Sequence, residues 1–194
     1  MPLIKKNPES APAAPASAAA TATDQRWAAA RSDTADVPAL AASLAKERDP
    51  RVQEALFTAL SRIATEESAR AVLPFLGSDD SGLRTRALDA LRAMPDAAKP
   101  CLPQLLADPD ADVRLLACDL VRDMRGEEGL LYTLLDTERE ANVCAAAVEV
   151  LAEIADARAL PVLSRCAARF ADDPFLAFAV KIAAERAGAR PTRE

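Results

Sequence analysis

An acidic residue stands three positions before an apolar residue at five nearly evenly spaced places in this chain of 194 residues. The pairs are Asp49/Val52, Asp80/Leu83, Asp110/Val113, Glu140/Val143 and Asp173/Leu176. Consecutive pairs lie 31, 30, 30 and 33 residues apart. A second register, formed by Pro74, Pro103, Tyr132 and Pro161, repeats every 29 residues. Periods of this size are typical of chains built from stacked supersecondary units.

Each unit has the pattern of two helices joined by a short turn. The acidic residue is placed to cap the second helix, because its side chain can accept hydrogen bonds from free amides and match the helix dipole. Apolar residues then recur at helical spacing, as in Val52, Leu56 and Leu60 of the first unit. A small residue, most often Ala, follows four positions after the first apolar one and allows close helix contact. No unit buries its apolar face alone, so the units are expected to stack into an all-α fold.

The phrases ARAVLPFLGSDDSGLRTRALDAL and CLPQLLADPDADVRLLACDLV resemble HEAT repeats of the short type found in phycobilin lyases. The resemblance covers about residues 35–187 and implies a right-handed α-solenoid of about five HEAT-like helix hairpins. In that family, an Asp and an Arg near the start of each second helix often form a ladder between repeats. Asp112 and Arg114 match this pattern, as does Arg84, but Gln53 and Cys144 replace the Arg elsewhere. We interpret Asp112 and Arg114 as partners in ordinary hydrogen bonds between repeats.

The composition divides the chain into a tail, a repeat domain at residues 24–188 and a short C-terminal tail at 189–194. Residues 7–23 contain three prolines, one charged residue and otherwise mostly Ala, Ser and Thr, which cannot build a core. We therefore predict a disordered N-terminal tail over residues 1–23. Asp24 is the predicted cap of a first helix that contains Trp27 and covers the first repeat, because solenoid ends need such capping helices.

Charge disfavours nucleic acid and anionic membranes as ligands. The formal net charge is −6, and residues 37–194 hold 20 basic against 26 acidic side chains. Affinity for nucleic acid comes mainly from neutralising phosphates, which an acidic body cannot do. No apolar run approaches 18 residues, and no apolar segment follows Lys5 and Lys6, so we expect a cytoplasmic protein. The heavy use of Arg and Ala points to a GC-rich bacterial genome.

The four cysteines are predicted to be buried, reduced thiols. Cys101, Cys118, Cys144 and Cys166 form no CxxC pair, and the chain has no histidine, so a zinc site is disfavoured. Without His, the commonest general base is also missing. We expect no metal, no cofactor and no catalytic residues.

The favoured function is that of a non-catalytic adaptor or regulatory scaffold that binds a partner protein on the concave face of the solenoid. In HEAT-like solenoids the second helices line that face, so their outward positions are the candidates. The predicted protein-binding residues are Thr85, Asp89, Arg92, Leu115, Asp119, Arg122, Glu149 and Phe178. In one interpretation Leu115 is an apolar anchor and the charges set orientation. In the other, the charges form ion pairs within each helix and Leu115 is a scattered surface residue.

Two other functions remain open at the level of sequence. Phycobilin lyase subunits share these repeats, so a lyase-like enzyme or subunit that handles a bilin chromophore is the alternative that the resemblance allows. The chain could also be a structural module that self-associates through its ends. We expect a monomer, and the sequence does not identify the partner.

Overall fold

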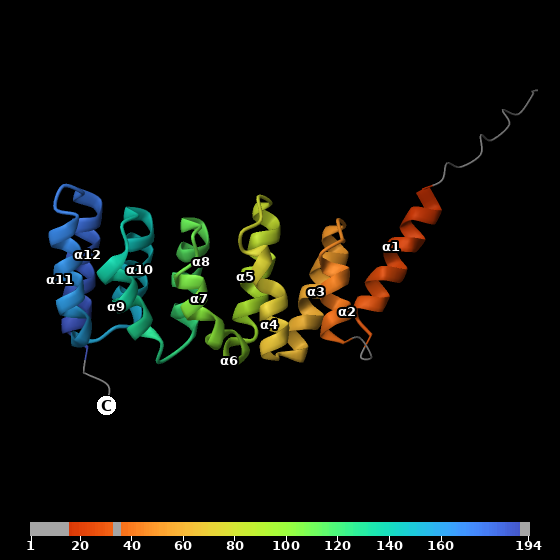
Figure 1. The fold of residues 1–194 in the computed structure, drawn as a ribbon, viewed down its shortest axis with the longest axis horizontal. Helices are drawn as coiled ribbons and strands as arrows, with labels where there is room; N and C mark the ends of the chain where they lie inside the picture. The colour runs from red at the N-terminus through yellow and green to blue at the C-terminus, as the bar shows by residue number, and fades with distance from the viewer. Residues whose placement is uncertain (1–15, 33–35, 191–194) are drawn as a thin grey trace, which may run out of the picture.

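The computed structural model describes residues 16–32 and 36–190, and over these residues the chain is a row of helix hairpins without strands. Figure 1 shows the hairpins side by side, with α1 (Ala16–Ala30) at one end and α11 and α12 at the other. The fold is therefore an all-α repeat solenoid, as the sequence predicts.

Each of the five repeats has a first helix, here called the A helix, and a second, the B helix. The A helices are α2 (Val37–Leu44), α4 (Glu66–Val72), α6 (Pro95–Ala98) with α7 (Leu102–Leu106), α9 (Glu128–Thr137) and α11 (Leu160–Arg169). Short 3-10 turns extend three of them, at η1 (Leu73–Phe75), η2 (Lys99–Cys101) and η3 (Ala157–Ala159). The B helices are α3 (Pro50–Ile63), α5 (Ser81–Arg92), α8 (Ala111–Asp123), α10 (Ala141–Ile154) and α12 (Pro174–Gly188).

The predicted caps of the B helices are confirmed at four of five places. Asp49, Asp80, Asp110 and Asp173 each accept a hydrogen bond from a backbone amide of the first helical turn. Glu140 stands at the same position, but its side chain makes no capping hydrogen bond. Glu is not among the residues favoured at this position, where short side chains such as Asp reach the free amides.

The B helices form a continuous core because each packs on its neighbours. α8 and α12 both lie against α10, and α3 contacts both α1 and α5. Leu60, Leu91 and Leu151 are fully buried along this row. The small residues Ala117 and Ala147 are fully buried too, as their spacing predicts.

All four cysteines are free and buried, which confirms the prediction from their spacing. Burial raises the pKa of the Cys118 thiol to about 12, so that thiol is held in its unreactive protonated form. Among the residues that the structure describes, no group of three or more acidic or cysteine side chains could hold a metal ion. The same part of the chain has no helix long and apolar enough to cross a membrane.

The first helix begins earlier than the sequence predicts. α1 starts at Ala16, and Asp24 lies inside it, so the prediction of Asp24 as its cap is wrong. Alanine has the highest helix propensity, so an Ala-rich segment that cannot build a core can still extend a helix. α1 packs on α3, with Ala30 buried and Trp27 half-buried against the core. Residues 1–15, the rest of the predicted tail, lie outside the described residues.

One contact closes the turn between the A and B helices in four repeats. Gln53, Arg84, Arg114 and Cys144 each donate from the side chain to the carbonyl oxygen six residues earlier. The donor atoms lie 3.0, 2.6, 2.9 and 3.8 Å from those oxygens, respectively. The position that varies in sequence therefore has a common structural role in these four repeats, because the Gln, Arg and Cys side chains found there all donate this bond.

The prediction that Asp112 and Arg114 form hydrogen bonds between repeats is confirmed for Arg114 only. Arg114 forms two hydrogen bonds with Glu138 of the next repeat, at 2.7 and 3.1 Å. Asp112 is exposed, and its side chain makes no hydrogen bond within the described part of the chain. Its backbone amide bonds to the Asp110 cap.

Candidate functional site

The outward-facing residues of α5, α8, α10 and α12, here called the B-helix face, carry a set of ion pairs that runs across three repeats. Arg92, at the end of α5, pairs with Asp119 and with Asp123 of α8, the latter at 3.1 Å. It also pairs with Asp89 of its own helix, at 3.3 Å. Arg92 thus links α5 to α8, a contact between repeats that neither interpretation of the sequence predicts.

Arg122 repeats the arrangement one repeat later. Its guanidinium lies 3.0 Å from Glu153 and 4.0 Å from Glu149, both on α10, and it also pairs with Asp119 on α8. Both Arg side chains are about one third exposed, at 32% and 31%, so each pair is expected to contribute only modestly, about 0.5 kcal/mol. The network thus links α5 to α8 and α8 to α10.

The network leaves the B-helix face acidic. Its two Arg side chains face five carboxylates, those of Asp89, Asp119, Asp123, Glu149 and Glu153. Glu149 is the most accessible of them, with 73% of its side chain exposed and only the 4.0 Å contact to Arg122. A ligand that approaches this face therefore meets an available carboxylate next to α12.

A groove of about 630 Å³ lies on this face between α10 and α12. Ala145 and Ala152 of α10 form a wall of small side chains. Phe175, Phe178 and Ile182 of α12 line the other side. Charged residues at its rim are Glu149, Glu153, Asp173 and Arg186. The size lies within the range of roughly 300–1,000 Å³ typical of ligand pockets.

The local sequence explains why two aromatic side chains point outward here. Asp173 accepts hydrogen bonds from the amides of Phe175 and Leu176, both at 3.0 Å, and Pro174 occupies the first helical position. α12 therefore begins at Pro174 and buries Leu176, so Phe175 and Phe178, three residues apart, share the opposite side. They are 86% and 65% exposed.

The predicted site residues fall into three groups. Asp89, Arg92, Asp119, Arg122 and Glu149 belong to the ion-pair network, and Phe178 and Glu149 line the groove. The remaining two predicted residues lie apart from both. Thr85 is exposed and donates a hydrogen bond to Ser81 of its own helix, and Leu115 is half-buried against the core. Leu115 therefore does not project from the face as an anchor would.

Four further residues of this face are not among the predicted ones: Phe175, Asp123, Glu153 and Arg186. A signal for Phe175 was present, because the equivalent position in the other B helices holds Arg51, Gly82, Asp112 and Asn142. A large aromatic residue at a position that is otherwise polar or small indicates an exposed apolar contact. Asp123 and Glu153 share the position ten residues after the first apolar residue of their helices, next to the predicted residue Arg122 and its equivalent Ala152.

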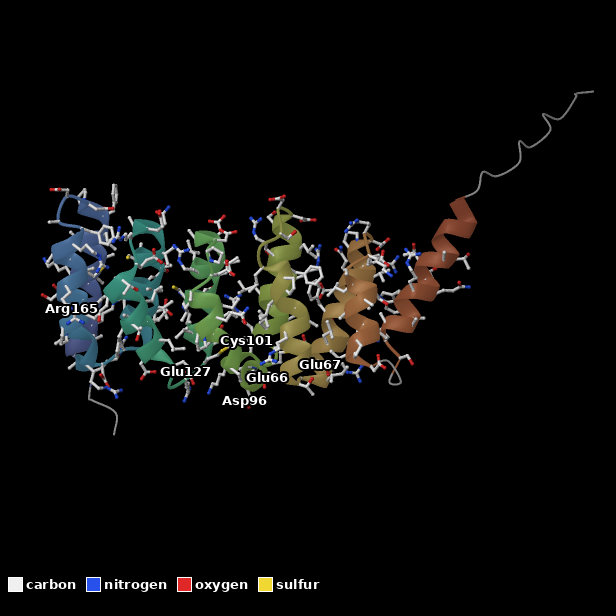
Figure 2. The ribbon with its side chains drawn as sticks, viewed as in Figure 1. Glu66, Glu67, Asp96, Cys101, Glu127 and Arg165 are labelled. Carbon is white, nitrogen blue, oxygen red and sulfur yellow. The ribbon has the colours of Figure 1, made fainter. Side chains whose placement is uncertain are left out.

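A second acidic surface, at the starts of the A helices, needs no ligand to explain it. Figure 2 shows Glu66, Glu67, Asp96 and Glu127 along one edge of the row. Glu66 and Glu67 lie in the first turn of α4, Asp96 lies in the first turn of α6, and Glu127 immediately precedes α9. Carboxylates at helix N-termini are stabilised by the helix dipole. This edge is therefore accounted for by helix stability.

The comparison with protein-family models agrees with the helical repeats described above. A family model for HEAT repeats matches residues 37–118, from the start of α2 into α8. Over these residues the chain resembles HEAT repeats. Among solved structures, it is similar to the crystal structure of an engineered protein, with 18% sequence identity and a TM-score of 0.43. That match covers 89% of this chain and 92% of the other. No curated protein matches the sequence.

Proposed function

We propose that this protein is a non-catalytic adaptor or scaffold that binds a partner protein on the B-helix face, with the groove between α10 and α12 at its centre. The observation that carries the proposal is the exposure of Phe175 and Phe178 beside that groove. Exposed clusters of large apolar side chains mark interaction sites on soluble proteins, and buried aromatic residues are frequent hot spots of binding. As in other HEAT-like solenoids, this face is taken to be the concave one.

The surrounding charges favour a partner with an apolar anchor and a nearby basic residue. Glu149 and Glu153 lie at the groove rim, and the ion-pair network next to it has more carboxylates than guanidinium groups. Charges at the rim of an interface set the association rate and the orientation more than the affinity. In this proposal the two Phe side chains make the apolar contact with the partner, and the carboxylates set the orientation in which the partner binds.

The end of the solenoid favours a monomer over self-association through the ends. Phe57, Leu88, Cys118 and Val148 occupy the same position in the first four B helices and are all buried. In α12 the equivalent residue is Lys181, which is exposed. A lysine at this position is poorly suited to pack against a further hairpin, because burying an unpaired ammonium group is unfavourable. Action in the cytoplasm fits the four free thiols, which that compartment keeps reduced.

The test removes the aromatic anchor without touching the core. Phe175→Ser with Phe178→Ser is expected to leave the melting temperature nearly unchanged, because both side chains are exposed. The matched control is Leu160→Ser, which changes another exposed apolar residue, on the A helix α11. Wild type and both variants are used as baits in quantitative pull-downs from the native host.

The expected partner is retained by wild type and by Leu160→Ser, and it is lost with the double Phe variant. A partner held equally by all three baits would place the binding site elsewhere. For the lyase-like alternative, the distinguishing measurement is bilin absorbance after co-expression with bilin and a phycobiliprotein acceptor.

A further inference from the structure

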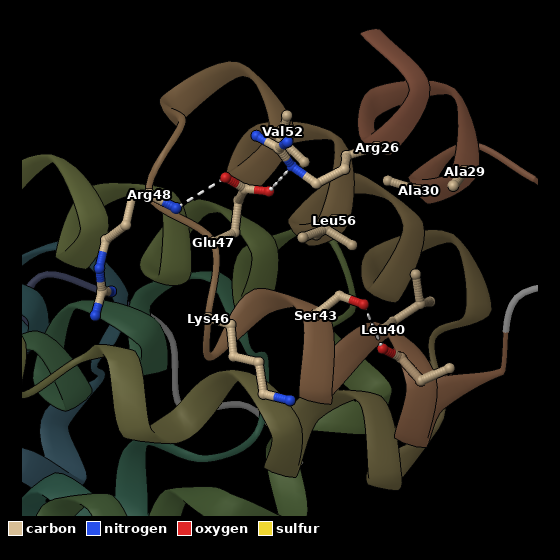
Figure 3. Close-up of a pocket in the computed structure, with 11 residues that line it drawn as sticks. Arg26, Ala29, Ala30, Leu40, Ser43, Lys46, Glu47, Arg48, Val52 and Leu56 are labelled. Carbon is tan, nitrogen blue, oxygen red and sulfur yellow. Dashed lines mark hydrogen bonds and ion pairs between the residues drawn. The ribbon is translucent and has the colours of Figure 1, made fainter. Parts of the chain in front are cut away.

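A second groove, of about 730 Å³, lies at the other end of the row, between α1 and the first hairpin. Figure 3 shows α1 on one side of it, with α2 and the start of α3 on the other. The buried side chains of Leu40, Val52 and Leu56 lie at its base. Ala29 and Ala39 are exposed on its walls and leave it open because their side chains are small.

The groove lies where the repeat pattern is incomplete. α4, α9 and α11 each pack against the A helix before them in the chain, as the contacts α2 with α4, α7 with α9 and α9 with α11 show. α1 instead packs on the B helix α3. Among the described residues, α2 therefore has an A helix on one side only. Within residues 16–32 and 36–190, the groove beside α2 is lined by α1, α2, the turn after α2 and the start of α3.

The charges around the groove differ from those of the molecule as a whole. Arg26 lies 2.8 Å from Glu47, and the same carboxylate accepts a hydrogen bond from the amide of Arg48 (Figure 3). It also accepts one from the amide of Asp49. The negative charge of Glu47 is thus already compensated. Lys46 and Arg48 are exposed residues of the groove lining, and neither forms an ion pair with any described residue. In a chain of net charge −6, this part of the groove is locally cationic.

We propose that this groove docks an amphipathic helical segment of a second protein, one with an apolar stripe and acidic residues beside it. The apolar stripe lies against Ala29, Ala39 and the side chains beneath them, beside α2 as a preceding A helix lies beside α4, α9 and α11. The acidic residues pair with Lys46 and Arg48. Recognition of an amphipathic helix in a groove is a recurring mode, with anchors at helical spacing. This site is independent of the groove between α10 and α12.

The test is a selection from a displayed library of random 16-residue peptides against the full chain, with counter-selection on Ala39→Arg. Ala39 is exposed, so the new side chain fills the groove without entering the core. The control is Ala42→Arg, which adds the same side chain to another exposed position of α2 outside the groove lining. The enriched peptides are expected to carry apolar residues at helical spacing with Asp or Glu beside them, and to bind Ala42→Arg as they bind wild type.

Fluorescence polarisation with the enriched peptides tests the role of charge. Lys46→Glu with Arg48→Glu is expected to weaken binding at least about tenfold, because like charges then face each other across the site. The control, Arg51→Glu with Lys181→Glu, changes the net charge equally at two exposed positions outside the groove. Higher salt is expected to weaken peptide binding to wild type. It should weaken binding to the control protein equally, so that the ratio of the two dissociation constants stays the same.

Three results would overturn the proposal: no enrichment on wild type over Ala39→Arg, enriched peptides without acidic residues, or equal binding by the two charge-reversed proteins. None of them bears on the pull-down with the Phe variants, because those residues lie at the opposite end of the row (Figure 1).

Discussion

At the scale of single residues, two buried glutamates hold turns of the solenoid in the same way. Glu138 accepts the backbone amides of Arg139 and Glu140, at 2.8 and 2.9 Å, and the guanidinium of Arg114 from the preceding B helix. Glu47 does the same with Arg26 of α1. Burial of Glu138 opposes its ionisation, but the hydrogen bonds from Arg114 and the two amides outweigh this effect, so its pKa is lowered.

Replacing Arg114→Ala is expected to lower the free energy of unfolding by about 2 kcal/mol, because it leaves a carboxylate that is only 6% exposed without its charged partner. Arg165→Ala serves as control, since Arg165 and Asp136 are bonded at 2.8 and 3.0 Å but are 56% and 43% exposed. The control is expected to change stability by less than about 0.5 kcal/mol. Urea titrations of the three proteins provide the measurement. Equal losses of unfolding free energy in the two variants would show that burial does not determine how much an ion pair contributes.

The same variant has a predictable dependence on pH. Because the pKa of Glu138 is lower in the folded state, its contribution to stability is present above the ordinary glutamate range and is lost as the pH falls through the lowered value. The difference in stability between wild type and Arg114→Ala is therefore largest near neutral pH and shrinks below about pH 4. A difference that stayed constant or grew on acidification would contradict this assignment of the pair.

At the scale of elements, the solenoid depends on close contact between B helices. Ala117 and Ala147 are fully buried at the position four residues after the first apolar residue of α8 and α10, and these two helices pack directly on each other. Such close packing leaves no space for larger side chains. The repeat period alone places these residues, because the helical spacing fixes which side of each helix faces the core.

Ala117→Leu and Ala147→Leu are each expected to reduce the free energy of unfolding by about 1–3 kcal/mol through overpacking. Ala29→Leu, at an exposed position of α1, should change it less. Thermal and urea unfolding of the three variants gives the comparison. Negligible effects at all three positions would mean that the register of the B helices is wrong.

At the scale of the whole molecule, each hairpin packs against its immediate neighbours in the row (Figure 1). Stability in such proteins is approximately a sum of contributions from each repeat and from contacts between neighbouring repeats. A destabilising change at one end should therefore lower the stability of the nearest repeats most. α1 covers α3 at the N-terminal end, and Arg26 of α1 is the partner of the buried Glu47.

A chain that begins at residue 36 is therefore expected to lose amide protection in α3, while α8 and α10 keep theirs. A chain that begins at residue 16 retains α1 and should match the full chain. Native-state hydrogen exchange followed by mass spectrometry distinguishes the two. An equal loss of protection in all five repeats would show that the row unfolds as one unit, contrary to this expectation.

The sequence alone determined the repeat length, the hairpin units, the Asp caps and the buried positions Ala117 and Cys118. All of these follow from contacts within one helix or from a period along the chain. Only the tertiary structure decided that Arg92 reaches Asp123 of the next repeat, or that Phe175 and Ala145 border one groove. The tertiary structure also shows why Gln53 and Cys144 can replace Arg, since both still reach the same carbonyl oxygen. These features depend on the distance and rotation between neighbouring helices, which packing sets and which a repeat period does not encode.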